Sequence, residues 1–103
     1  MKKKPQICSE CPVSNTAKIV GDFWLLLIVR SLLDGPKRFN ELAESLHGIS
    51  RRTLTQKLHK AEDEELVVRH EYAEAPPRVE YKLTPRGKKM RAIIKAVETF
   101  TKG

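Results

Sequence analysis

The chain has 103 residues, the length of one domain, and its 20 Lys and Arg against 13 Asp and Glu give a net charge of +7. Two cysteines are too few for a disulfide scaffold, and the longest apolar run, residues 23–29, is far below the roughly 20 residues that span a membrane. No apolar signal segment precedes the cysteines, so we expect one cytoplasmic domain over residues 1–103. The charge indicates a polyanionic partner, or a solvated lysine-rich surface that binds nothing.

The first part of the chain is predicted to be helical. Ser14 or Asn15 can cap a short helix that Gly21-Asp22 interrupts. Residues 23–33 are apolar on nearly every side, which predicts a central buried helix.

Two further helices follow a turn. Residues 34–37, "DGPK", have chain-reversing chemistry, after which Asn40 can cap a short helix that Gly48 closes. Ser50 can cap the next helix, whose buried stripe at i, i+4 and i+7 is formed by Leu54, Leu58 and Ala61.

The last third of the chain is predicted to form a hairpin and a final helix. Residues 66–72 contain β-branched residues and alternate in part between apolar and polar, and residues 79–83 alternate throughout, which predicts two strands. The loop 73–78 between them contains Pro76-Pro77. Thr84-Pro85 supplies a cap and a first-turn proline for a helix over about 85–101. The order predicts a mainly α fold with a small β-hairpin, the winged helix-turn-helix, in which the second helix docks in the major groove.

The helix predicted at residues 50–61 has the side chains needed to recognise DNA. Its exposed face carries Arg and Gln, whose paired donors and acceptors fit guanine and adenine edges. Residues 50–60 hold four Lys or Arg and no acid, whereas residues 62–65 are all acidic. An ordinary amphipathic helix would also have a solvated polar face, but it would not need its charges sorted along its length. The predicted contacts to double-stranded DNA are Arg38, Ser50, Arg51, Arg52, Thr53, Thr55, Gln56, Lys57, His59 and Arg78.

Several motifs in combination resemble the HxlR-type winged-helix transcriptional regulators. They are "CPV" at 11–13, "IVGDFWLLLIVRSLLDGPKRFNELAESLHGIS" at 19–50, "LTQKL" at 54–58 and "PRVEYKLTPRG" at 77–87. The resemblance implies a small dimeric DNA-binding regulator whose N-terminal and final helices build the dimer. It also implies that the cysteine before proline, here Cys11, senses oxidants or electrophiles in some members. The chain departs from the family at Asp22-Phe23, where Gly-Lys is usual, and at Glu65, where a glycine usually closes the recognition helix.

The final helix also favours a homodimer on the residues alone. Its apolar stripe continues to Phe100, further than one small domain needs for its own core. The alternative is that this stripe packs against the first helix of the same chain.

Cys8 and Cys11 remain open to several interpretations. They supply two of the four ligands of a structural zinc, and no histidine has ligand spacing, so we expect neither a metal nor a cofactor. Cys11 lies at a predicted helix start near lysines, which favours its thiolate, and Cys8 is a candidate resolving thiol. No catalytic constellation is evident, so we expect no enzyme and identify no small-molecule effector. The alternatives are a thiol-disulfide redox protein, which would need a βαβ unit, and a winged-helix module for protein contacts.

Overall fold

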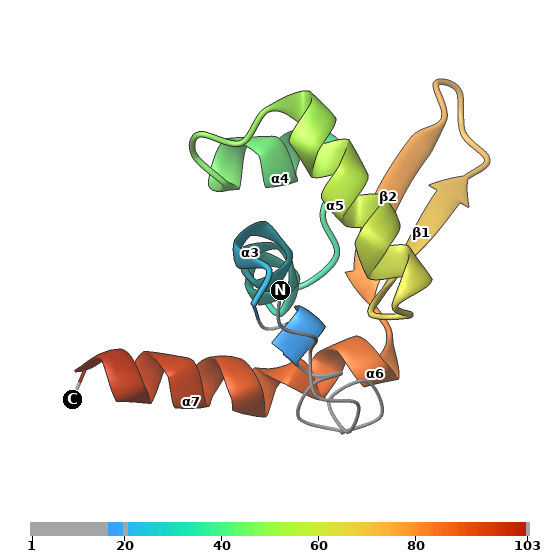
Figure 1. Cartoon of the computed structure of the whole chain (residues 1–103). Helices are drawn as coiled ribbons and strands as arrows, with labels where there is room; N and C mark the ends of the chain where they lie inside the picture. The colour runs from blue at the N-terminus through green and yellow to red at the C-terminus, as the bar shows by residue number, and fades with distance from the viewer. Residues whose placement is uncertain (1–16, 20, 103) are drawn as a thin grey trace, which may run out of the picture.

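The computed structural model describes residues 17–19 and 21–102 of the chain. Residues 17–19 are helical and are followed by the elements of Figure 1. These elements are α3 (Phe23–Leu32), α4 (Phe39–Ser45), α5 (Arg51–Asp63), β1 (Val67–Tyr72), β2 (Arg78–Leu83), α6 (Pro85–Lys88) and α7 (Met90–Lys102). The predicted caps Ser14 and Asn15, and both cysteines, lie outside the described residues. None of the helices in the described ranges is long and apolar enough to cross a membrane.

The architecture is a winged helix-turn-helix, which confirms the predicted fold class. Helices α4 and α5 form the helix-turn-helix, and β1 and β2 form an antiparallel hairpin with Val67 opposite Leu83 and Tyr72 opposite Arg78. Lys37 pairs with Tyr81 through two backbone hydrogen bonds of 3.0 and 2.8 Å, so the chain joins the hairpin just before α4. Figure 1 shows the hairpin extending beside α5 and α7 running along the opposite edge of the molecule.

The core is built around α3, as its apolar sequence predicts. Leu25, Ile28 and Val29 are fully buried, and the α5 stripe of Leu54, Leu58 and Ala61 packs into the same cluster. The first turn of α3 is the exception, because Phe23 is 65% exposed and stacks edge-on against Trp24.

The cap predicted for the short helix α4 is wrong. Asn40 lies inside the helix, and Arg38 is the N-cap, with its backbone N–H donating to Glu41 Oε1 at 2.7 Å. The pairing of Lys37 with Tyr81 explains the earlier start, because the chain leaves the hairpin and turns directly into the helix at Phe39.

The predicted final helix is two helices. Thr84 caps α6 as expected, with its hydroxyl accepting from Gly87 N–H at 2.9 Å and donating to the Glu65 carbonyl at 2.6 Å. The first helix, α6, ends after four residues at Lys88, Lys89 is its C-cap, and α7 begins at Met90. Gly87 is required here, because a Cβ atom on this residue would lie 2.1 Å from the carbonyl oxygen of Leu66.

Candidate nucleic-acid interface

The N-terminal end of α5 is fixed by a side-chain cap. The hydroxyl of Ser50 accepts a hydrogen bond from Thr53 N–H at 3.0 Å and donates to Thr53 Oγ1 at 2.9 Å. Ser50 is thus the N-cap that the sequence predicts, and its hydroxyl is engaged within the helix. The remaining first-turn amides and the helix dipole favour an anion in front of this end.

The exposed side of α5 carries polar side chains with no acid between Arg51 and Lys60, and Asp63 follows on the same side in the last turn. Arg52, Gln56 and His59 are exposed, one helical turn apart, and make no side-chain hydrogen bond or ion pair to another described residue. Thr55 is exposed on the same side and donates its hydroxyl to the Arg51 carbonyl at 2.9 Å. We call Arg52, Thr55, Gln56 and His59 the α5 outer face. It combines cationic, hydroxyl, amide and imidazole groups on one exposed side of the helix.

Arg51 joins α5 to α4. Its guanidinium donates to Asn40 Oδ1 at 2.9 Å and lies 5.3 Å from the centre of the Phe39 ring. This pair explains why Asn40 faces α5 instead of capping its own helix. Arg38, also exposed, begins α4 beside the wing, which we define as β1, β2 and the loop 73–77.

Lys57 lies apart from the outer face, although the sequence groups it there. Its ammonium lies 2.8 Å from Asp22 Oδ2, and the ammonium of Lys60 lies 2.8 Å from the same oxygen. Asp22 is the N-cap of α3, where its other oxygen accepts from Leu25 N–H at 3.0 Å. Two lysines of α5 are therefore bound to the beginning of the central helix and are not free to meet a ligand.

The charge of Asp22 is stabilised by these partners. Its side chain is only 8% exposed, and burial alone would raise the pKa of the carboxyl. Hydrogen bonds from Lys57, Lys60 and the Leu25 amide outweigh burial and lower the pKa to about 2. Asp22 is absent from the residues predicted for the site, because its partners lie 35 and 38 positions away in the sequence. The available signal was the i, i+3 spacing of the two lysines beside the buried stripe.

Arg78 of the wing is also engaged by acids. Its guanidinium lies 2.9 Å from Glu74 Oε2 and 2.8 Å from Glu80 Oε2, and 3.9 Å from the centre of the Tyr72 ring. The hydrogen bond between Arg78 and Glu74 raises the pKa of the arginine and lowers that of the glutamate. The structure therefore places Arg78 at the base of the wing loop with its charge balanced by neighbouring acids.

The C-terminal end of α5 is closed by a residue with a positive φ. Glu65 has φ 60°, and the amides of Glu65 and Leu66 donate to the carbonyls of Glu62 and Ala61, each at 2.9 Å. This is the Schellman pattern, which glycine usually completes. The positive φ at Glu65 is a conformation that glycine adopts readily, at the position where the resemblance leads us to expect a glycine.

Comparison with known proteins places this geometry in a family. The HxlR-like helix-turn-helix family model matches residues 19–103. This chain belongs to the HxlR-like helix-turn-helix family. Among curated HxlR-like relatives, the HTH-type regulator YodB of Bacillus subtilis is 35% identical over 91 residues, covering 87% of this chain and 81% of YodB. An HTH-type regulator of Synechocystis is 36% identical over 87 residues, but the match spans 84% of this chain and only 64% of that protein.

Solved structures of other regulators share the fold. The reduced form of YodB superposes with a TM-score of 0.80 at 35% identity, covering 87% of this chain and 89% of YodB. The redox regulator HypR in its oxidised form gives 0.83 at 34% identity, covering 89% and 95% of the two chains.

Proposed function

We propose that this protein is a DNA-binding transcriptional regulator that recognises sequence through the α5 outer face. The supporting observation is that Arg52 and Gln56 are exposed, without side-chain partners among the described residues, on a face of α5 that carries no acid between residues 51 and 60. In a winged helix-turn-helix the second helix enters the major groove, where these side chains match guanine and adenine edges. Family membership supports the same function.

The outer face and its surroundings suggest different roles for the predicted residues. Arg52 and Gln56 are proposed to contact base edges, and Thr55 and His59 extend the same face. Phosphate contacts are proposed for Arg38, for Arg51 and for the capped helix start at Ser50 and Thr53. Lys57 and Arg78, which are held in ion pairs, are proposed to orient α5 and the wing.

Enrichment of genomic fragments on the purified full chain tests the proposal and identifies the bound sequences. Affinity for an enriched site should fall steeply with salt, with a log–log slope of roughly −5 to −9 for 6 to 10 phosphate contacts. A flat salt response, or no enrichment over bulk DNA, would refute DNA binding by this chain.

We propose that the chain acts as a homodimer through α7. Val97 and Phe100 on this helix are 40% and 88% exposed, and they continue a stripe whose earlier members, Met90 and Ile94, are buried. A two-fold dimer would present two α5 helices to half-sites about 34 Å apart. Phe100→Glu should convert a dimer to a monomer in sedimentation, and Thr101→Glu at the exposed next position should not. Dimers of the Phe100 variant at the wild-type affinity would rule out this interface.

We further propose that oxidation of Cys11 modulates DNA binding, with Cys8 as its resolving thiol. The support is the resemblance at "CPV" and the similarity to HypR, which is described as a redox regulator. A mild oxidant should change the DNA affinity of the wild type and leave that of Cys11→Ser unchanged. The same response in both proteins would exclude Cys11 as the sensor. The alternative of a thiol-disulfide enzyme lacks support, because the sheet of the described residues is one antiparallel hairpin.

A further inference from the structure

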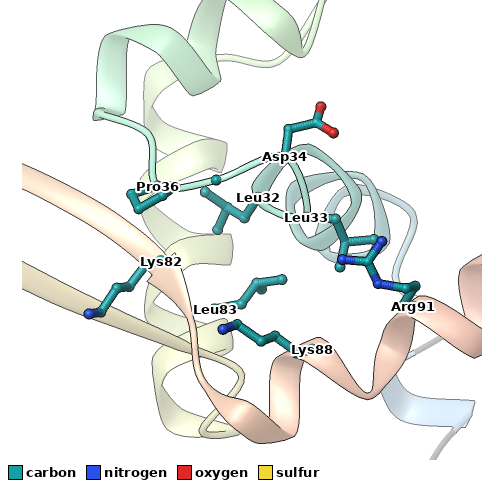
Figure 2. Close-up of a pocket in the computed structure, with 9 residues that line it drawn as sticks. Leu32, Leu33, Asp34, Pro36, Lys82, Leu83, Lys88 and Arg91 are labelled. Carbon is teal, nitrogen blue, oxygen red and sulfur yellow. The ribbon is translucent and has the colours of Figure 1, made fainter.

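A cavity lies between the end of α3 and the junction of β2 with the last two helices. Its volume is about 300 Å³, and its lining comes from residues 32–36, from Lys82 and Leu83, and from Lys88 and Arg91 (Figure 2). None of the residues on the α5 outer face lines it. This volume is at the lower end of the range of ligand sites and about twice that of an apolar cavity that accepts benzene.

The floor of the cavity is apolar. Leu32 and Leu83 belong to the core and are 3% and 6% exposed, and Leu33 and Pro36 complete the apolar wall. Figure 2 shows Leu32 and Leu83 between Pro36 and Lys88, with Leu33 to one side of them near Arg91. A ligand bound here has one side in contact with apolar side chains instead of water, which favours a ring or a branched aliphatic group.

The rim of the cavity is cationic on the side of the last two helices. Lys88 extends beside Leu83, and the guanidinium of Arg91 lies beside Leu33 (Figure 2). Among residues 17–19 and 21–102, neither Lys88 nor Arg91 makes an ion pair. The carboxylate of Asp34 points away from the leucine floor in this view, so it does not neutralise the two cations from within the cavity.

We propose that this cavity binds a small organic carboxylate with a single ring or a similar apolar body. The carboxylate would be held by Lys88 and Arg91, and the body would cover Leu32, Leu33 and Leu83. The ligand therefore needs both a negative charge and an apolar body. A site for inorganic anions needs no apolar floor, and a site for neutral hydrocarbons needs no cations. The two cations could also attract a DNA phosphate, but the apolar floor favours an anion that carries a ring.

Benzoate is a suitable probe, and methyl-resolved NMR of the full chain is a suitable measurement. Saturable shifts are expected at the methyl groups of Leu32, Leu33 and Leu83. Acetate, inorganic phosphate and benzyl alcohol should each bind at least about tenfold more weakly than benzoate, because each lacks the ring or the charge.

Matched variants distinguish the site from general attraction to a basic protein. Lys88→Gln and Arg91→Gln should each weaken benzoate binding about tenfold, because a charge-assisted contact is lost. Lys89→Gln removes the same charge at an exposed position that does not line the cavity, so it should stay within about twofold. Equal losses in all three variants, shifts that do not saturate, or acetate or phosphate binding as tightly as benzoate would each overturn the proposal. None of these readouts involves DNA, so the result is independent of the proposed regulatory function.

Discussion

The α5 helix and the wing both carry arginines toward the side where DNA is proposed to lie, but they hold them differently. Arg52 on α5 has no partner among the described side chains, whereas Arg78 at the wing is bound by Glu74 and Glu80 and packs on Tyr72. The contrast teaches that cations of the same type can differ in whether the fold pairs them with acids, which the sequence alone does not reveal. Within α5 itself, Lys57 and Lys60 make the same point, since one buried carboxylate binds both.

The largest expected effect is on Arg52. Arg52→Ala should weaken binding to a specific site by 1–3 kcal/mol, or about 5- to 150-fold, because a bidentate base contact is removed. A filter or anisotropy titration on an enriched site measures this loss. Lys89→Ala is a control of equal charge change away from α5. Equal losses in the two variants would mean that Arg52 acts only through net charge.

The second effect concerns the pairing of Asp22 with α5. Asp22→Asn keeps an equally good N-cap but removes the charge that binds Lys57 and Lys60, and it should lower the free energy of unfolding by about 2 kcal/mol at neutral pH. Denaturant titration measures this loss. Asp34→Asn, an exposed turn residue, should change stability by less than about 0.5 kcal/mol.

The same pair predicts a defined pH window. The pKa of Asp22 is about 2 in the folded protein and 3.8 in its ordinary state, so the unfolded chain binds more protons between these values. The stability from this carboxylate is complete above about pH 4 and is lost as the pH falls toward 2. The stability difference between wild type and Asp22→Asn should therefore shrink over this window. A difference that stays constant to pH 2 would contradict the charged pair.

A smaller effect is expected at the end of α5. Glu65→Gly should stabilise the protein by about 1 kcal/mol, because a side chain at φ 60° is strained and glycine is not. Glu64→Gly is the matched control, since Glu64 has φ −83° and should lose stability from added backbone freedom. Thermal unfolding in which both variants lose stability would show that Glu65 is not strained.

The smallest effect is expected at the wing. Arg78→Gln should lower DNA affinity by at most about threefold, because the arginine is already balanced by acids near the surface. The same DNA titration measures it. A loss as large as that of Arg52→Ala would show that Arg78 leaves its acids to bind DNA.

Periodicity and caps predicted most of the fold because they are local. The apolar residues 23–33, the stripe of Leu54, Leu58 and Ala61, and the cap at Ser50 each lie within a few positions of their cause. The errors arose where a distant segment decides the outcome. The pairing of Lys37 with Tyr81 sets the start of α4 at Phe39. The division of the final helix at Lys89 follows a short helix whose Gly87 packs closely on the backbone of Leu66.

Which side of α5 is exposed could be predicted from the sequence, but which of its charges are paired could not. The sequence identified the exposed side of α5, which periodicity determines. It could not separate Arg52 from Lys57, because the difference depends on Asp22, 35 positions away from Lys57. Glu74 and Glu80 are close to Arg78 in sequence, but their contacts with it depend on how the hairpin turns and could not be predicted.

Selection of preferred sequences from a randomised DNA library tests the contrast between α5 and the wing most directly. Wild type, Arg52→Ala and Arg78→Gln are compared at one salt concentration. We predict that Arg52→Ala relaxes the preference at a defined base position of each site and that Arg78→Gln selects the wild-type sequence. A wild-type preference in Arg52→Ala, or a changed preference in Arg78→Gln, would contradict recognition by the α5 outer face.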